Sequence, residues 1–174
     1  RGWRASWYVS LLAVFSGLGF LAALFVKLTV SYGAFVYAVV LLTGALVLAR
    51  PFSATLIAFF SGVIYSLQSP LFLMIVGTFL ARGFVLDLVF IPAGVYRDAR
   101  AGRYNVWLIT VGMAASSFAA GVYQYFFMTL FMRRLVDFGA FVVSTIFLVG
   151  LVSNVAAGYL VPKYIMPRLK GVLR

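Results

Sequence analysis

The sequence contains no cysteine, no histidine and only three acidic residues among its 174 positions. The absence of cysteine excludes disulfides, thiolate metal sites and thiol catalysis. The absence of histidine removes the usual ligand of zinc, copper and haem and the usual general base of enzymes. We therefore expect no metal site and no bound cofactor.

Motifs for nucleotide hydrolysis and for hydrolytic enzymes are also missing. The chain has no G-x-x-x-x-G-K-[ST] loop, no G-x-S-x-G elbow and no H-E-x-x-H helix. The topology predicted below puts Asp98 and Asp137 on opposite sides of a membrane, so these carboxylates cannot act as a catalytic pair. The sequence predicts a binding or translocation role and no enzymatic activity.

Apolar residues dominate what is present. The chain is 65% hydrophobic, 18% aromatic and 10% charged, with a mean hydropathy of +1.12. Soluble domains are about 45–50% apolar and about 25% charged. With repeated apolar runs long enough for helices, this composition predicts an all-α polytopic membrane protein, forming a single membrane domain over residues 1–174.

Six membrane spans are predicted from these runs. The second and third are short and are separated only by "ARP" at 49–51, so a helical hairpin or one kinked element would fit. Pro51 is expected at the first position of the third helix, where its missing N–H is harmless. The spans are Trp7–Val26, Ala34–Leu48, Phe52–Leu67, Leu71–Phe90, Val106–Met132 and Phe138–Val161.

The net charge of +11 is distributed at the ends of the apolar runs. This placement is typical of topology determinants and does not indicate a nucleic-acid surface. An excess of cations on one side predicts a multi-pass plasma-membrane protein with both termini in the cytoplasm. The predicted inner cations are Arg1, Arg4, Arg50, Arg97, Arg100, Arg103, Lys163, Arg168, Lys170 and Arg174, and the outer ones are Lys27, Arg133 and Arg134.

The stretch "ARGFVLDLVF" (81–90) places Arg82 and Asp87 inside an apolar span. Arg82 is expected about 17 Å into a core of about 30 Å, and Asp87 about 24 Å in and about 140° around the helix. Charged residues within spans mark functional sites or specific partners. A wet cavity, an anionic or carbonyl-bearing ligand, or backbone carbonyls of a broken helix would each suit Arg82. For Asp87 we expect a structural or gating role, neutralised by arginines at the cytoplasmic face.

A second set of polar and aromatic residues is expected near the outer surface. Aromatic faces with amides and hydroxyls suit a flat, uncharged or weakly charged heterocycle, although an interfacial tyrosine belt is also consistent with them. Asn154 lies deeper and fits either an interhelical hydrogen bond or a site residue. The predicted binding residues are Arg82, Tyr65, Gln68, Tyr123, Gln124, Ser144 and Thr145.

Small residues in the first span form two small-xxx-small pairs, Ala13 with Gly17 and Gly19 with Ala23. Such pairs let helices approach closely. Packing within the chain and contact with another subunit remain alternative interpretations.

Three stretches resemble one transporter family. "RGFVLDLVF" (82–90) resembles the fourth-helix signature of the substrate-binding S-components of energy-coupling-factor (ECF) vitamin transporters, especially the hydroxymethylpyrimidine and thiamine group. "VLARPFSATLIAFFSGVIYSL" (47–67) looks like the Arg-Pro turn and following helix of that family, and "YRDARAGRY" (96–104) like its basic stretch. The resemblance covers roughly residues 40–104.

This resemblance implies a six-helix subunit that captures a small-molecule vitamin from outside the bilayer. Its partners would be a transmembrane coupling subunit, contacted through Ala13 and Gly17, and two ATP-hydrolysing subunits. Two alternatives remain: a non-catalytic accessory subunit of a larger membrane complex, such as a respiratory complex, and a stand-alone facilitator.

Overall fold

The computed structural model describes residues 2–29, 33–132 and 137–170, which form helices joined by turns without any strand. This confirms the all-α prediction. The helices are α1 (Gly2–Leu28), α2 (Ala34–Leu48), α3 (Ser53–Ser66), α4 (Phe72–Phe90), α5 (Val95–Arg100), α6 (Val106–Leu130), α7 (Phe138–Val142), α8 (Thr145–Leu160), a π-helical turn (Val161–Ile165) and α9 (Met166–Lys170).

Four stretches of the described residues are long and apolar enough to cross a membrane. Helices α2 and α3 have 15 and 14 residues, or about 22 and about 21 Å at 1.5 Å per residue, less than a bilayer core of about 30 Å. The chain is thus multi-pass, while the count of six spans stays a prediction. The four stretches are Ala5–Val26, Phe72–Phe90, Val106–Leu130 and Phe147–Leu169.

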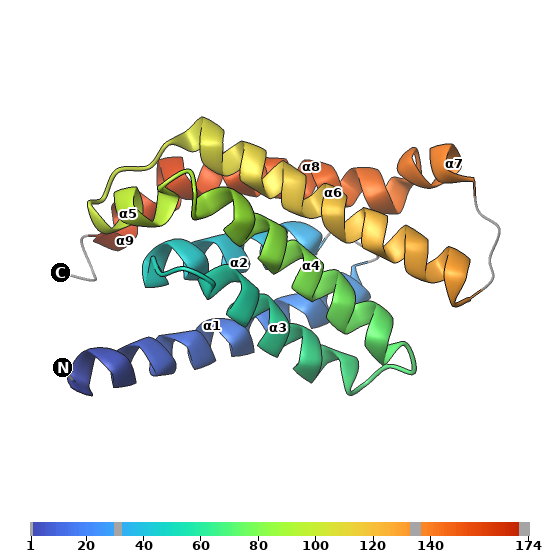
Figure 1. Cartoon of the computed structure of the whole chain (residues 1–174), viewed down its shortest axis with the longest axis horizontal. Coiled ribbons are helices and arrows are strands. Elements are labelled where there is room, and N and C mark those ends of the chain that lie inside the picture. The colour runs from blue at the N-terminus through green and yellow to red at the C-terminus, as the bar shows by residue number, and fades with distance from the viewer. Residues whose placement is uncertain (1, 30–32, 133–136, 171–174) are drawn as a thin grey trace.

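Helix α2 forms the centre of the bundle and contacts α1, α3 and α8 (Figure 1). Its side chains Leu41, Leu42 and Ala45 have no exposed surface. A helix that is apolar on all faces is expected to be enclosed by other helices. The short α2 is therefore surrounded mainly by protein.

The turn between α2 and α3 resolves the question of a hairpin or a kink. Ala49 and Phe52 have φ values of 46° and 62°, in the left-handed region that non-glycine residues rarely adopt. They end one helix and start another, and α2 and α3 pack against each other as a hairpin. The prediction for Pro51 was wrong, because α3 begins at Ser53 and Pro51 lies within the turn.

The predicted sixth span, Phe138–Val161, is two helices in the structure. The short α7 ends at Val142, and α8 begins after Ser144, whose backbone is extended. The Ser144 Oγ accepts a hydrogen bond from the Phe147 N–H at 3.4 Å and caps the new helix. Hydropathy alone does not detect this break, because the residues on both sides are apolar.

The two ends of the bundle differ. The start of α1, α5 and α9 lie together at one end, whereas α7 and the end of α6 lie at the other (Figure 1). Arg97 and Arg100 of α5 are exposed at the first end. Among the predicted outer cations, Arg133 and Arg134 lie outside the described residues.

Candidate functional site

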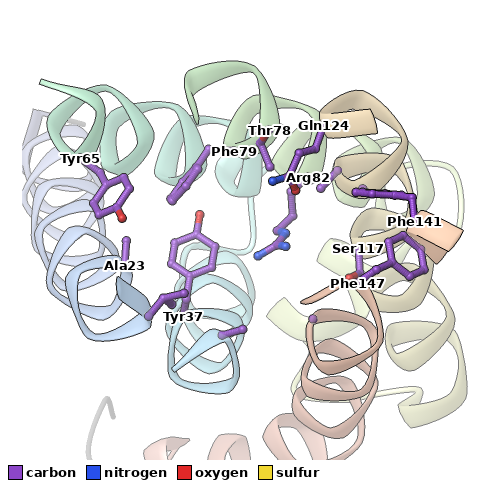
Figure 2. Close-up of a pocket in the computed structure, with 15 residues that line it drawn as sticks. Ala23, Tyr37, Tyr65, Thr78, Phe79, Arg82, Ser117, Gln124, Phe141 and Phe147 are labelled. Atoms are coloured by element: carbon purple, nitrogen blue, oxygen red, sulfur yellow. The ribbon is translucent and has the colours of Figure 1, made fainter. Parts of the chain in front are cut away.

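A cavity of about 280 Å³ lies between the helices, toward the end of the bundle that carries α7. It is bounded by the ends of α1 and α3, the starts of α2 and α8, the middle parts of α4 and α6, and α7. Figure 2 shows the side chains that converge on this space. We refer to it as the pocket.

Aromatic rings form two opposing walls of the pocket (Figure 2). On one side, Phe79 lies between Tyr37, in edge contact with a centroid separation of 4.9 Å, and Tyr65, stacked at 5.9 Å. On the other side, Phe141 and Phe147 meet edge to face at 5.7 Å. Walls of this kind accept the faces of a flat ligand.

Polar groups are few and lie between these walls. Thr78, Ser117 and Gln124 line the pocket together with Arg82. The Thr78 hydroxyl is occupied, because it donates to the Met74 carbonyl at 2.7 Å. A few polar groups among apolar ones are typical of small-molecule sites, where they orient the ligand.

Asn154 stands behind the pocket lining and has no exposed surface. Its Nδ2 donates to the Gly150 carbonyl at 2.7 Å and to the Ser117 Oγ at 3.4 Å. Ser117 belongs to α6 and Asn154 to α8, so the amide makes an interhelical hydrogen bond and holds Ser117 in place. Of the two roles proposed for Asn154, the geometry favours the interhelical bond.

Arg82 extends from α4 into the pocket, between Tyr37 on one side and Ser117 on the other (Figure 2). Its Cζ lies 5.6 Å from the centroid of the Tyr37 ring, a weak cation–π contact. Its Nε is buried and makes no hydrogen bond to the described part of the chain. Among the described residues, Arg82 is the one charged side chain that lines the pocket.

Asp87 lies five residues, or about 1.4 turns, further along α4 and has no exposed surface. Its Oδ2 accepts hydrogen bonds from the Thr55 N–H at 2.7 Å and the Thr55 hydroxyl at 2.6 Å, and its Oδ1 accepts one from the Tyr96 hydroxyl. Thr55 lies in the first turn of α3, whose N-cap residue Phe52 offers no side-chain cap. Asp87 therefore caps α3 from a neighbouring helix, where a negative charge also complements the helix dipole.

A glycine brings the two helices close enough for this cap. A Cβ at Gly83 would lie 2.7 Å from both the Ala54 carbonyl oxygen and the Ala58 Cβ. Only a residue without a side chain permits this approach of α4 to α3. Burial and the adjacent carboxylate raise the pKa of Tyr96, so its hydroxyl stays protonated and available as a donor.

The arginines expected to neutralise Asp87 have other partners. The Arg97 and Arg103 side chains lie 4.0 and 3.7 Å from the Asp98 carboxylate. The Arg50 Cζ lies 4.6 Å from the centroid of the Tyr8 ring. Neutral donors from α3 and α5 replace the predicted ion pair.

The seven predicted binding residues divide into two groups. Tyr65, Arg82 and Gln124 line the pocket, and the other four do not. The Tyr123 hydroxyl donates to the Leu73 carbonyl at 3.1 Å and packs over Gly77, where a Cβ would lie 2.0 Å from it.

The remaining members lie near the helix ends. Gln68 is exposed beyond the end of α3, Ser144 caps α8, and Thr145 is exposed. These positions place them near the pocket end of the bundle without bringing them into its lining.

Several lining residues were not predicted, although some left a signal in the sequence. Phe79 and Thr78 lie three and four residues before Arg82 and share its helical face, so the position of Arg82 could have led to them. Ser117 lies within "GMAASSFAAG" (112–121), a stretch rich in small residues. Tyr37, Phe141 and Phe147 reach the pocket only through the packing of distant helices.

The two small-residue pairs of α1 face different ways. Gly19 faces inward, where a Cβ would lie 2.8 Å from the Ser61 Oγ, and Ala23 is buried. Ala13 is exposed, and a Cβ at Gly17 would meet nothing within 4 Å. The pair Gly19 and Ala23 serves internal packing, while the described part of the chain leaves the face with Ala13 and Gly17 exposed.

Comparison with known proteins gives a structural likeness. No protein-family profile matches the chain, and no curated protein matches it. A crystal structure of an S-component of an ECF transporter is similar, with a TM-score of 0.65 over 99% of this chain and 88% of that chain. This chain has the S-component fold. Sequence identity is 16%, so the likeness concerns the fold and not the ligand.

Proposed function

We propose that this chain is the substrate-capture membrane subunit of an ATP-driven importer of the ECF type, and that it binds a small water-soluble vitamin or vitamin precursor. The observation that carries the proposal is the pocket, a cavity of about 280 Å³ with aromatic walls and one charged side chain, on an S-component fold. Its volume is near the lower end of small-molecule sites, about 300–1,000 Å³. The resemblance of residues 40–104 to the hydroxymethylpyrimidine and thiamine group makes these two compounds the first to test.

The charge distribution supports an orientation for this importer. Arg97, Arg100 and Arg103 are exposed near α5, at the end of the bundle opposite the pocket. Cytoplasmic ends of membrane proteins carry such an excess of arginine. Both termini then lie in the cytoplasm of a plasma-membrane protein, and the pocket faces outward, as capture from outside requires.

The chain needs partners to move its ligand, because it carries no motif for ATP hydrolysis. We assign that work to two ATPase subunits acting through a transmembrane coupling subunit. The outward face of α1 supports the docking of the coupling subunit. Ala13 and Gly17 are flanked there by Val14, Leu18 and Leu21, all exposed. Small residues let a partner helix approach closely, and the larger apolar ones extend the contact.

Catalysis has little support at the pocket. Its described lining contains no carboxylate, and the chain contains no histidine or cysteine. An accessory subunit of a respiratory or other complex would need the apolar surface but no cavity, so the pocket favours capture. A stand-alone facilitator would transport its ligand without ATPase subunits.

Two helical glycines provide a matched test. Gly150 lines the pocket, and a Cβ at either Gly150 or Gly17 would meet nothing within 4 Å. We expect Gly150→Leu to fill the pocket and lower ligand affinity at least about 100-fold, since affinity depends on burying the ligand. Gly17→Leu should leave affinity unchanged and reduce assembly with the coupling subunit.

The measurement is thermal stability of the purified chain in detergent against a panel of water-soluble vitamins and precursors. It is combined with co-purification of coexpressed ECF coupling and ATPase subunits. A stabilising compound that Gly150→Leu no longer binds supports capture. If no compound of the panel stabilises the wild-type chain, or if uptake persists without ATPase subunits, the proposal is contradicted.

A further inference from the structure

The charge of Arg82 has no carboxylate partner among the described residues. Its Nε is buried without a hydrogen bond to the described residues, and Figure 2 shows its guanidinium directed into the pocket. No carboxylate of the described residues lies within ion-pair distance of it. An arginine at membrane depth is costly and normally faces a partner or water.

All three acidic side chains of the sequence are described, and each is engaged elsewhere. Asp87 accepts hydrogen bonds from Thr55 and Tyr96. Asp98 is adjacent to Arg97 and Arg103, and Asp137 caps α7 by accepting from the Ala140 N–H at 2.9 Å. The counter-ion of Arg82 must therefore come from outside these side chains.

The pocket also restricts the form of that anion. Among the described residues, one arginine and no second cation line the pocket. One positive charge balances a single negative charge better than the two charges of a phosphate monoester. A guanidinium matches the two oxygens of a carboxylate in a fork-like geometry. The rings of Tyr37 and Phe79 on one side and Phe147 on the other favour a flat ligand body.

We propose that the pocket selects a small aromatic or heteroaromatic monocarboxylate, with its carboxylate on Arg82 and its ring between the aromatic walls. The proposal rests on the capture function and narrows its substrate class. Gln124 and Ser117 remain for polar atoms on the ring. A cationic compound such as thiamine meets Arg82 with no carboxylate to offset the repulsion, so it is disfavoured relative to an anion of the same size.

The test uses carboxylates paired with their own amides, so that only the charge and one polar group differ. Nicotinate with nicotinamide, 4-aminobenzoate with 4-aminobenzamide, and indole-3-acetate with indole-3-acetamide are titrated into the purified full chain in detergent. Isothermal calorimetry gives Kd, and thiamine and hydroxymethylpyrimidine serve as cationic and neutral comparisons. We expect at least one acid to bind about tenfold or more tightly than its amide.

Variants assign that preference to one side chain. Arg82→Gln should bring the acid down to the affinity of its amide while amide binding changes less than about twofold. Arg168→Gln, an exposed change outside the pocket, should keep the full preference. The unliganded Arg82→Gln chain should be at least as heat-stable as the wild type, because it loses a buried charge that has no carboxylate partner among the described residues.

The outcomes separate the two proposals. If thiamine, hydroxymethylpyrimidine or an amide binds as tightly as any acid, capture stands and the anionic substrate class is wrong. If no compound binds the wild type, both proposals fail. If unliganded Arg82→Gln is strongly destabilised, Arg82 has a structural role and the assignment is overturned.

Discussion

Arg82 and Asp87 are five residues apart on α4 and have opposite surroundings. Asp87 is enclosed and receives three hydrogen bonds from Thr55 and Tyr96. Arg82 points into a cavity, and its Nε has no partner among the described residues. A buried charge whose partners lie in the chain stabilises the fold, whereas one without partners is available to a ligand. Removing each charge should therefore change stability in opposite directions.

The largest effect is expected from Asp87→Asn. The amide keeps one acceptor oxygen, but its NH2 group faces either the Thr55 donors or the Tyr96 hydroxyl, and the charge that strengthens these bonds is lost. We expect a loss of about 3 kcal/mol in the free energy of unfolding. Denaturant unfolding in detergent, followed by circular dichroism, measures it. Wild-type stability in this variant would show that Asp87 does not hold α3.

A gain in stability is expected from Arg82→Met. Methionine has a similar length and no charge, so the unliganded chain should gain about 2 kcal/mol, somewhat less than the insertion penalty of about 2.5–3.5 kcal/mol for a mid-membrane arginine. The same unfolding measurement applies, with Arg82→Lys as the control that keeps the charge and should change little. A destabilised Arg82→Met would remove the contrast between the two charges.

The smallest effect is expected from a variant that removes one hydrogen bond of the α3 cap. Thr55→Val keeps the shape of the side chain and the backbone N–H but removes the hydroxyl that donates to Asp87 at 2.6 Å. We expect a loss of about 1 kcal/mol in the free energy of unfolding. In the double variant with Asp87→Asn the two losses should be less than additive, since they share one interaction. Strict additivity would contradict a direct bond.

Local sequence signals predicted α2, α4 and α6 well. The bounds of α2 agree at both ends, and α4 and α6 agree within two residues, because each follows a continuous apolar run. The split before α8 was missed because one serine cap interrupts apolar sequence on both sides. Such a cap has little weight in a hydropathy pattern.

The pocket was predictable only in part. Arg82, Tyr65 and Gln124 stood out as polar residues within apolar runs. Tyr123 stood out equally but turns toward Leu73, since Gly77 leaves room for its ring on that side. Which way a residue faces depends on how each helix is rotated in the bundle, and one sequence does not fix these rotations.

The cap that Asp87 provides for α3 has a consequence for how the protein is made. Thr55 and Asp87 are separated by 32 positions, so the start of α3 is synthesised before its cap exists. At about 5–20 residues per second, the ribosome needs about 2–6 s to reach the aspartate. During that interval the α2–α3 hairpin, whose two helices are each shorter than a bilayer core, lacks the carboxylate that completes it. We expect the hairpin to settle in the membrane only when α4 arrives, which makes the first four helices one unit of biogenesis.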